Sequence, residues 1–323
     1  METGPERLRP TRRLSGHPRW LATRRVPARA AGGPGGFPTT IPEQGANMTV
    51  LLAGCGDLGT ETGLRFAEAG HRVVGLRRSA ERLPGAITGH SVDLTHQRPP
   101  VPEDTGVVVI VLTADRRNAE GYRRTYLDGT RNVLDALDRS GSSPRILFVS
   151  STAVYGNATG WLDERSPAEP ASETGRVLLE AEHAVRERRP DAVVLRLAGL
   201  YGPGRTSLID QARTGEVPNS PAPRYTNRIH RDDAAAAIVH LTTDVPNPEP
   251  VYLGVDDCPV ERTEVLRFLA EQTGGPPPAA DHPVTGDKRF RNDRLRSTGF
   301  RFAHPTYREG YRAILAGRGR RHP

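Results

Sequence analysis

One short stretch limits the folds open to this chain more than any other: an apolar run that enters a glycine-rich turn and leaves it as a helix. The run is Thr49–Ala53, the turn is Gly54–Gly59 (GCGDLG), and the helical pattern ends at Gly70. A second apolar run, Arg72–Leu76, follows at once. Continuous apolar runs are typical of strands that are buried on both faces. The stretch therefore predicts the first strand–helix–strand unit of a parallel α/β sheet.

The glycines of this turn stand where a dinucleotide-binding turn needs small residues. Gly54 allows the tight turn, Gly56 lets the backbone approach a pyrophosphate, and Gly59 permits close packing of helix on strand. The helix N-terminus, at Asp57 and Leu58, adds unpaired N–H groups and a partial positive charge. We therefore assign these five residues to the binding of a nicotinamide dinucleotide. The alternative is a glycine-rich turn that binds nothing.

The end of the second strand indicates which dinucleotide is bound. A fold that binds NAD usually has an acidic residue about 20 residues after the turn, where it binds the ribose 2′-hydroxyl. Here Arg77 and Arg78 occupy that place, and the next acidic residue is Glu81. A guanidinium can bind a 2′-phosphate instead, so the sequence favours NADP over NAD. The alternative is that both arginines are simply solvated.

The rest of the chain alternates between strand and helix patterns. Strand patterns lie at 87–92, 107–112, 145–150 and 192–197, and helical patterns lie at 122–139 and 173–189. This alternation predicts an α/β fold with a doubly wound parallel sheet (Rossmann fold) over residues 48–198. Proline and glycine become frequent after residue 198. We therefore expect a smaller C-terminal α/β substrate lobe, with a basic tail, over residues 199–323.

The charge is distributed unevenly along the chain. The formal net charge is +7, but the basic residues gather in residues 1–47 and after residue 285, whereas the middle of the chain is acidic. We expect residues 1–47, which are rich in Arg, Pro and Gly, to be a disordered extension upstream of a start at Met48. The basic ends favour weak, non-specific polyanion binding at most, and no specific nucleic acid.

Composition excludes several classes of protein. No apolar run approaches the roughly 20 residues of a membrane helix. The two cysteines, Cys55 and Cys258, provide neither a disulfide framework nor a paired-cysteine zinc pattern. We expect a cytoplasmic protein that binds neither a membrane nor a metal.

Several later segments resemble those of one protein family, in the same order. They are 92–95 (VDLT), 128–136 (DGTRNVLDA), 148–156 (FVSSTAVYG), 195–205 (LRLAGLYGPGR) and 229–236 (IHRDDAAA). With the glycine turn, they make residues 48 to about 315 similar to the extended short-chain dehydrogenases/reductases of the NAD-dependent epimerase/dehydratase family.

The resemblance implies that Asp93 contacts the adenine and that Ser151 is the catalytic Ser or Thr. We add Thr113 and Ala114, which follow the strand at 107–112, to the cofactor-binding residues. The resemblance also implies a small-molecule substrate, such as a nucleotide sugar or another carbonyl or hydroxyl compound. A homodimer follows by the same analogy.

The helix after Ser151 departs from the family pattern. Family members carry Tyr-x-x-x-Lys there, in which the tyrosine is the acid/base and the lysine lowers its pKa. Here Thr174 and Leu178 occupy the two positions, and Lys288 is the only lysine in the chain. A threonine hydroxyl is a far poorer proton donor than a phenol, and a leucine binds nothing polar.

Three residues are candidates for the remaining chemistry. Ser151 either contacts the substrate or caps the strand end, and Tyr155 and His230 are candidates for the missing acid, although each also fits as a loop or core residue. The first functional hypothesis is an NADP-dependent oxidoreductase or epimerase/dehydratase with an altered acid/base site, which the resemblance to the family favours. The alternative is a non-catalytic dinucleotide-binding sensor or partner-binding module.

Overall fold

The computed structural model describes Met1 and residues 47–215, 225–278 and 287–323. The chain divides into two compact units, Met1–Pro38 and Thr39–Pro323, and every element described below belongs to the second. The extension expected at 1–47 therefore lies almost wholly outside the described residues.

A seven-stranded sheet, in which every pairing is parallel, forms the centre of the second unit. The strands lie in the order β11-β7-β5-β4-β1-β2-β3. They are β1 (Thr49–Ala53), β2 (Arg72–Arg77), β3 (Thr88–Ser91), β4 (Thr105–Ile110), β5 (Arg145–Ser151), β7 (Val193–Leu197) and β11 (Val251–Gly254). This confirms the predicted doubly wound sheet. The strand order reverses between β1 and β4, which is where open α/β sheets bind their ligands.

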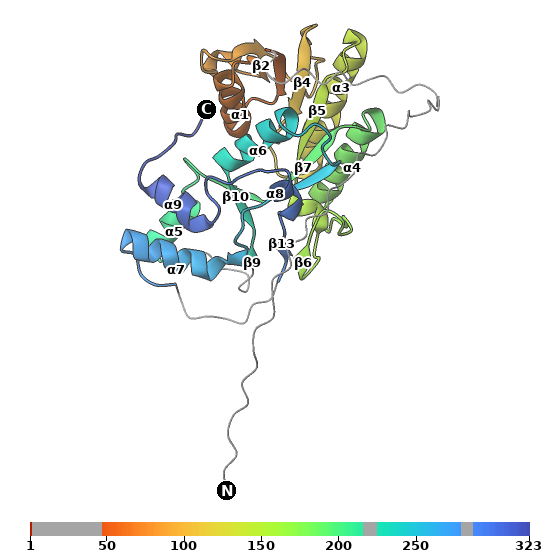
Figure 1. Ribbon diagram of the computed structural model, residues 1–323. Helices are drawn as coiled ribbons and strands as arrows, with labels where there is room; N and C mark the ends of the chain where they lie inside the picture. The colour runs from red at the N-terminus through yellow and green to blue at the C-terminus, as the bar shows by residue number, and fades with distance from the viewer. Residues whose placement is uncertain (2–46, 216–224, 279–286) are drawn as a thin grey trace. The chain divides into compact units, whose positions relative to one another are not determined.

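Helices cover both faces of the sheet (Figure 1). The helices α1 (Asp57–Glu68) and α6 (Arg231–Thr243) lie on one face, and α3 (Gly129–Ser140) and α4 (Glu173–Arg188) lie on the other. Alternate residues of β1 point to opposite faces: Val50 and Leu52 pack in the core with the alanines of α6, whereas Leu51 packs with α3. An apolar residue at each position is therefore what this strand needs.

The helix expected at 122–139 is interrupted. It consists of α2 (Ala119–Tyr122), a π-helical turn η2 (Arg123–Asp128) and α3. A π turn inserts an extra residue into the helical repeat and so redirects the side chains that precede it, often at functional sites. Here it carries Arg124 and Thr125, which line the cavity described below.

The remaining elements form a lobe beyond the carboxyl edge of the sheet. Its helices are α5 (Ser207–Thr214), α7 (Arg262–Thr273), α8 (Asp293–Ser297) and α9 (Tyr307–Leu315). Three short pairs accompany them: β8 (Gly199–Tyr201) with β10 (Arg228–His230), β9 (Tyr225–Thr226) with β12 (Val260–Glu261), and β6 (Trp161–Leu162) with β13 (Arg289–Phe290). Two short 3-10 turns, η1 (Ala80–Arg82) and η3 (Thr152–Tyr155), follow β2 and β5. Because α6 packs on α1 and β11 pairs with β7, the chain after residue 199 contributes to the sheet as well as to the lobe.

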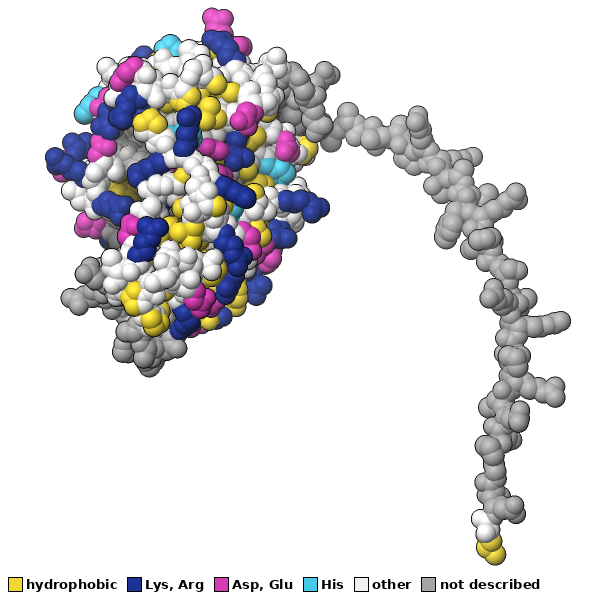
Figure 2. Space-filling view, turned by 90° about the vertical axis from the view of Figure 1, so that its left-hand side faces the viewer, with side chains coloured by type: hydrophobic (Ala, Val, Ile, Leu, Met, Phe, Trp, Pro, Cys, Tyr) yellow, Lys and Arg dark blue, Asp and Glu magenta, His cyan; other side chains and the backbone are white. Residues whose placement is uncertain are grey.

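The surface carries both signs of charge. On the face drawn in Figure 2, basic side chains are interspersed with acidic ones rather than gathered into one patch. Among the described residues, no helix combines the length and the apolar character needed to cross a bilayer.

Candidate functional site

The glycine turn joins β1 to α1 and leaves no room for side chains at two of its three glycines. Gly54 has a φ of +101°, and a Cβ added there would lie 2.5 Å from the carbonyl oxygen of Val111. A Cβ on Gly59 would lie 2.4 Å from the carbonyl oxygen of Gly54. Real Cβ atoms do not come so close, so the tight turn and the close helix packing both require glycine.

Gly56 differs from the other two because the space beside it is open. Its φ is −83°, and an added Cβ would meet no atom within 4 Å. It is the N-cap of α1 and offers no side-chain cap, and no acceptor among the described residues pairs with the backbone amides of Asp57 and Leu58. Unpaired N–H groups at a helix N-terminus bind anions such as phosphate. The turn therefore fits the diphosphate of the expected dinucleotide.

A cavity of about 780 Å³ opens beside this turn, at the carboxyl ends of β1, β2 and β4. Its size is that of a small-molecule pocket. It brings together six of the residues assigned from the sequence to the cofactor: Gly54, Gly56, Arg77, Arg78, Asp93 and Thr113. The other four, Asp57, Leu58, Gly59 and Ala114, are not among its lining residues.

The cavity also contains polar residues that sequence reasoning missed. Ser79, Arg82, Asp115 and Arg124 line it with the six residues above. Ser79 and Arg82 follow the arginine pair within four residues, so their position in the sequence was a usable signal. Arg124 carried no such signal, because it lies far from the arginine pair in sequence, within the π turn.

Both arginines at the end of β2 already have acceptors. Arg78 pairs with Asp115 through two hydrogen bonds of 2.6 and 2.8 Å, and both side chains are more than half exposed. Arg77 donates from Nη1 to the carbonyl oxygen of Pro323 at 2.9 Å. They lie at the cavity where a 2′-phosphate is expected, but both guanidiniums already donate hydrogen bonds within the protein.

Asp93 lines the cavity at the end of β3, as an adenine contact must. Its Oδ1 accepts hydrogen bonds from the Thr95 hydroxyl at 2.7 Å and from the Thr95 amide at 3.0 Å. The hydroxyl bond above all holds the pKa of Asp93 below its ordinary value. The carboxylate is thus ionised and oriented, and its contact with adenine stays a prediction.

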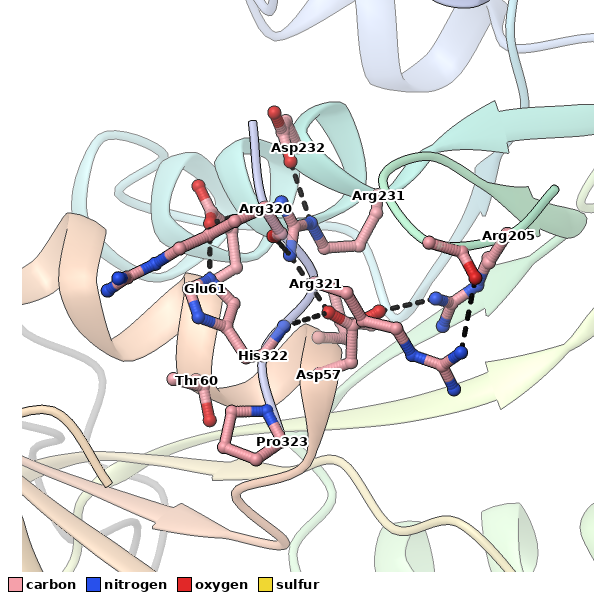
Figure 3. A network of polar contacts seen from close by, with 12 residues as sticks. Asp57, Thr60, Glu61, Arg205, Arg231, Asp232, Arg320, Arg321, His322 and Pro323 are labelled. Atoms are coloured by element: carbon pink, nitrogen blue, oxygen red, sulfur yellow. Dashed lines mark hydrogen bonds and ion pairs between the residues drawn. The ribbon is translucent and has the colours of Figure 1, made fainter. Parts of the chain in front are cut away.

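The side chain of Asp57 does not line the cavity. Its carboxylate receives hydrogen bonds from the amide of His322 and from the guanidiniums of Arg205 and Arg231 (Figure 3). Burial opposes ionisation of Asp57, but these donors outweigh it and hold its pKa below the ordinary value. Only the backbone amide of Asp57 therefore remains for the diphosphate.

Ser151 ends β5 at the carboxyl edge of the sheet and is half-buried. Its Oγ accepts from the amide of Ala153 at 3.2 Å and so caps the turn η3. Among the described residues nothing accepts its hydroxyl proton. Ser151 therefore caps the strand end and still has a proton to donate.

Thr174 and Leu178 lie one turn apart on α4. Thr174 is partly exposed, and its hydroxyl lies 3.1 Å from that of Ser172, the N-cap of the helix. Leu178 is only 3% exposed and packs with Val154, Tyr155 and other apolar residues. The position that carries lysine in the family pattern is thus part of the hydrophobic core here.

Tyr155 is fully buried and does not line the cavity. Its hydroxyl donates to the carbonyl oxygen of Asp163 at 3.1 Å and accepts from Arg196 at 2.9 Å. Arg196 in turn forms a buried ion pair with Glu182. Burial raises the pKa of Tyr155, although Arg196 opposes this. The phenol is therefore occupied within the core, in a polar cluster that the sequence did not reveal.

His230 is buried at the N-terminus of α6. Its Nδ1 accepts from the amide of Asp232 at 3.2 Å, so it caps the helix, and its Nε2 has no partner among the described residues. Burial, followed by the neighbouring His304, lowers the pKa of His230 to about 4. The ring is therefore neutral at pH 7 and lacks the extra proton that an imidazolium would give up as a general acid.

His230, Asp233 and His304 bring potential metal-ligand atoms within 4.8 Å of one another. The two rings stack at 3.9 Å with 31° between their planes, so their in-plane lone pairs do not converge. The carboxylate of Asp233 already accepts from the amides of Ala303 and His304 and faces Nδ1 of His304 at 3.1 Å. Hydrogen bonds thus occupy the carboxylate of Asp233, whereas Nε2 of His230 has no partner among the described residues.

The comparisons with known proteins agree with this architecture. Residues 50–254 match the model of the NAD dependent epimerase/dehydratase family. The chain belongs to this family. The predicted resemblance is thus confirmed, and the match spans the strands from β1 to β11.

Two known proteins are similar to this chain over most of their length. YeeZ of Escherichia coli K12 is 27% identical over 270 residues, which cover 79% of this chain and 96% of that protein. A solved structure from Methylobacillus flagellatus, described under the same epimerase/dehydratase name, is 36% identical, with a TM-score of 0.72 over 84% of this chain and 99% of that one.

Two other similar proteins are named for a substrate or a bound ligand. An N-acetyl-alpha-D-glucosaminyl-diphospho-ditrans,octacis-undecaprenol 4-epimerase of E. coli O157:H7 is 33% identical over 115 residues, 34% of either chain. MoeE5, solved with UDP-glucuronic acid and NAD, is 22% identical, with a TM-score of 0.69 over 84% of this chain and 98% of that one. At that identity the likeness shows the fold alone.

Proposed function

We propose that the chain binds a nicotinamide dinucleotide in the cavity beside the glycine turn. The amides of Asp57 and Leu58 would hold the diphosphate, with Gly54, Gly56 and Gly59 giving it room. The observation that carries this proposal is the pair of unpaired amides next to the open space at Gly56. Family membership supports it, and MoeE5 holds NAD. Asp93, Thr113 and Ala114 remain in the proposed contact set.

We further propose that NADP binds more tightly than NAD. Arg77, Arg78 and Arg82 all line the cavity near the end of β2 and together could neutralise a 2′-phosphate. Asp115 reduces this effect because it already pairs with Arg78. The preference therefore rests mainly on Arg77 and Arg82.

The proposed reaction is an oxidoreduction, epimerisation or dehydration with an altered acid/base site. The dinucleotide supplies hydride transfer when bound, and this chain's residues bind and orient the substrate. Ser151 would donate a hydrogen bond from its free hydroxyl to a carbonyl or hydroxyl oxygen of the substrate. The MoeE5 complex holds a nucleotide sugar, and the E. coli 4-epimerase is named for a sugar on a polyprenyl diphosphate, so both names favour a sugar carried on a diphosphate, such as a nucleotide sugar.

A second candidate function is a non-catalytic dinucleotide-binding sensor or partner-binding module. The specific observation in its favour is the state of the candidate acids: Leu178 lies in the core, Tyr155 is occupied and His230 is buried and neutral at pH 7. Without an acid at the site, the dinucleotide would bind but turn over slowly.

One set of measurements tests both functions. NADP and NAD are titrated calorimetrically, and hydride exchange is followed with a panel of nucleotide sugars, ketones and aldehydes. Binding together with a turnover that S151A lowers by about 100-fold supports the enzyme. The matched control, S143A, changes an exposed loop serine and should leave turnover unchanged. Binding without turnover supports the second function, and absence of dinucleotide binding overturns the proposal.

Two proposals concern the whole protein. By analogy with the family we propose a homodimer, for which light scattering should give twice the 35.2 kDa of one chain. We also propose a cytoplasmic location, which the two free thiols, Cys55 and Cys258, support.

A further inference from the structure

The last residues of the chain dock onto the helix that carries the glycine turn (Figure 3). We call residues 317–323, which follow α9, the C-terminal strap. His322 is only 5% exposed; its amide donates to Asp57 Oδ1 at 3.0 Å, and its Nε2 lies 2.9 Å from Glu61. Arg231, at the start of α6, donates to the carbonyl oxygen of Arg320 at 3.0 Å. These contacts hold the strap between α1 and α6, the two helices on that face of the sheet.

The loop after β8 is shaped to receive the strap. Gly204 has a φ of +71°, and a Cβ there would lie 2.6 Å from Cδ of Arg321, whose guanidinium donates to the Gly204 carbonyl oxygen at 3.1 Å. Gly319 has a φ of +74°, and its Cβ would lie 2.8 Å from Pro203. The two segments thus approach each other closely through glycines on both sides, which is what a specific contact needs and a loose tail does not.

The strap ends at a residue of the proposed cofactor site. The carbonyl oxygen of Pro323 accepts from Nη1 of Arg77 at 2.9 Å, and Arg77 lines the cavity. A 2′-phosphate of NADP needs the same guanidinium. NAD carries a hydroxyl in place of that phosphate and makes no such demand.

We propose that the C-terminal strap is an autoinhibitory contact that competes with the 2′-phosphate of NADP for Arg77. NADP displaces the end of the strap, whereas NAD leaves it docked. Because the strap also rests on Arg231 and on the loop after β8, its release transmits cofactor binding to the substrate lobe. This inference rests on the proposed function, because it requires a dinucleotide in the cavity.

Affinity measurements on a shortened chain test the competition. A chain that ends at Gly319 lacks Arg320–Pro323 and keeps every residue that lines the cavity. We expect it to bind NADP about tenfold more tightly than the full chain, roughly the worth of one hydrogen bond to a charged group, and NAD with unchanged affinity. In the R77A background the same shortening should leave NADP affinity unchanged. NADP affinity that is equal or weaker in the shortened chain overturns the inference.

Proteolysis of the full chain detects whether the strap is docked, without a measurement of affinity. Arg318, Arg320 and Arg321 are trypsin sites within it, and cleavage there is followed by the intact mass. NADP should accelerate this cleavage and NAD should not, whereas H322A should accelerate it with no dinucleotide present. If NADP leaves the rate unchanged although it binds, the inference fails and the proposed function stands. If neither the full nor the shortened chain binds a dinucleotide, the inference and the proposed function both fail.

Discussion

Cys55 shows how burial decides the chemistry of a single residue. It stands second in the glycine turn, just before α1, where a helix dipole favours a thiolate. The structure buries it completely, with the Thr60 hydroxyl within hydrogen-bonding distance of its sulfur. Burial raises the pKa of Cys55 to about 11 and outweighs the contribution of the Thr60 hydroxyl. The residue therefore acts as a small apolar side chain that fits the turn.

Alkylation of the native protein tests whether the buried Cys55 thiol is unreactive. At pH 8 only about one Cys55 thiol in 1,000 is ionised, so iodoacetamide should leave Cys55 unmodified while it labels the partly buried Cys258. Peptide mass mapping distinguishes the two sites. In guanidinium chloride both should react, which is the control. Rapid labelling of native Cys55 would contradict the burial described here.

His230 makes a second prediction at the residue scale. Its folded-state pKa of about 4 lies below the ordinary value near 6.5, so the unfolded chain binds the extra proton between these two values. Its contribution to stability is therefore complete above pH 6.5 and is lost as the pH falls towards 4. H230N keeps an acceptor for the amide of Asp232 and does not titrate. The free energy of unfolding of the wild type, measured relative to that of H230N, should fall by about 3 kcal/mol between pH 7 and pH 4. A constant difference would contradict the assignment.

At the scale of elements, α4 shows why the departure from the family pattern is more than one exchange. Leu178 faces inward and packs on Val154, Tyr155 and Phe290. Glu182, one turn later, pairs with the buried Arg196, and Ser150 donates to Glu182 at 2.5 Å. The inner face of this helix therefore combines apolar packing with one fully partnered ion pair. A lysine at position 178 would be buried within this face.

Substitution at Leu178 tests this packing. L178K places an ammonium in an apolar cluster and should lower the free energy of unfolding by about 3 kcal/mol, measured by urea denaturation. L178M has a similar volume and should cost under about 1.5 kcal/mol. If L178K proved as stable as L178M, the site around position 178 would be open to solvent. T174Y with L178K would then be the variant in which to look for restored turnover.

At the scale of the whole molecule, the fold followed from local signals but much of the site did not. The glycine turn and the apolar runs specify β1, α1 and the sheet within a few residues, because strand and helix periodicity are local. The partners of Asp57 are Arg205, Arg231 and His322, which lie 148, 174 and 265 residues away in sequence. No local pattern connects such residues. The contacts of Tyr155 with Arg196 and of His230 with His304 also join residues that are far apart in sequence, so they were hidden for the same reason.

The central claim is that the start of α1 holds a diphosphate, and G56A tests it most directly. The φ of Gly56, −83°, suits alanine, and the new methyl group would meet no protein atom within 4 Å. G85A is the matched control, because a Cβ at Gly85 also meets nothing within 4 Å. We predict that G56A unfolds at the temperature of the wild type but binds NADP at least about tenfold more weakly by calorimetry, whereas G85A changes neither. Undiminished NADP affinity in G56A would contradict the account.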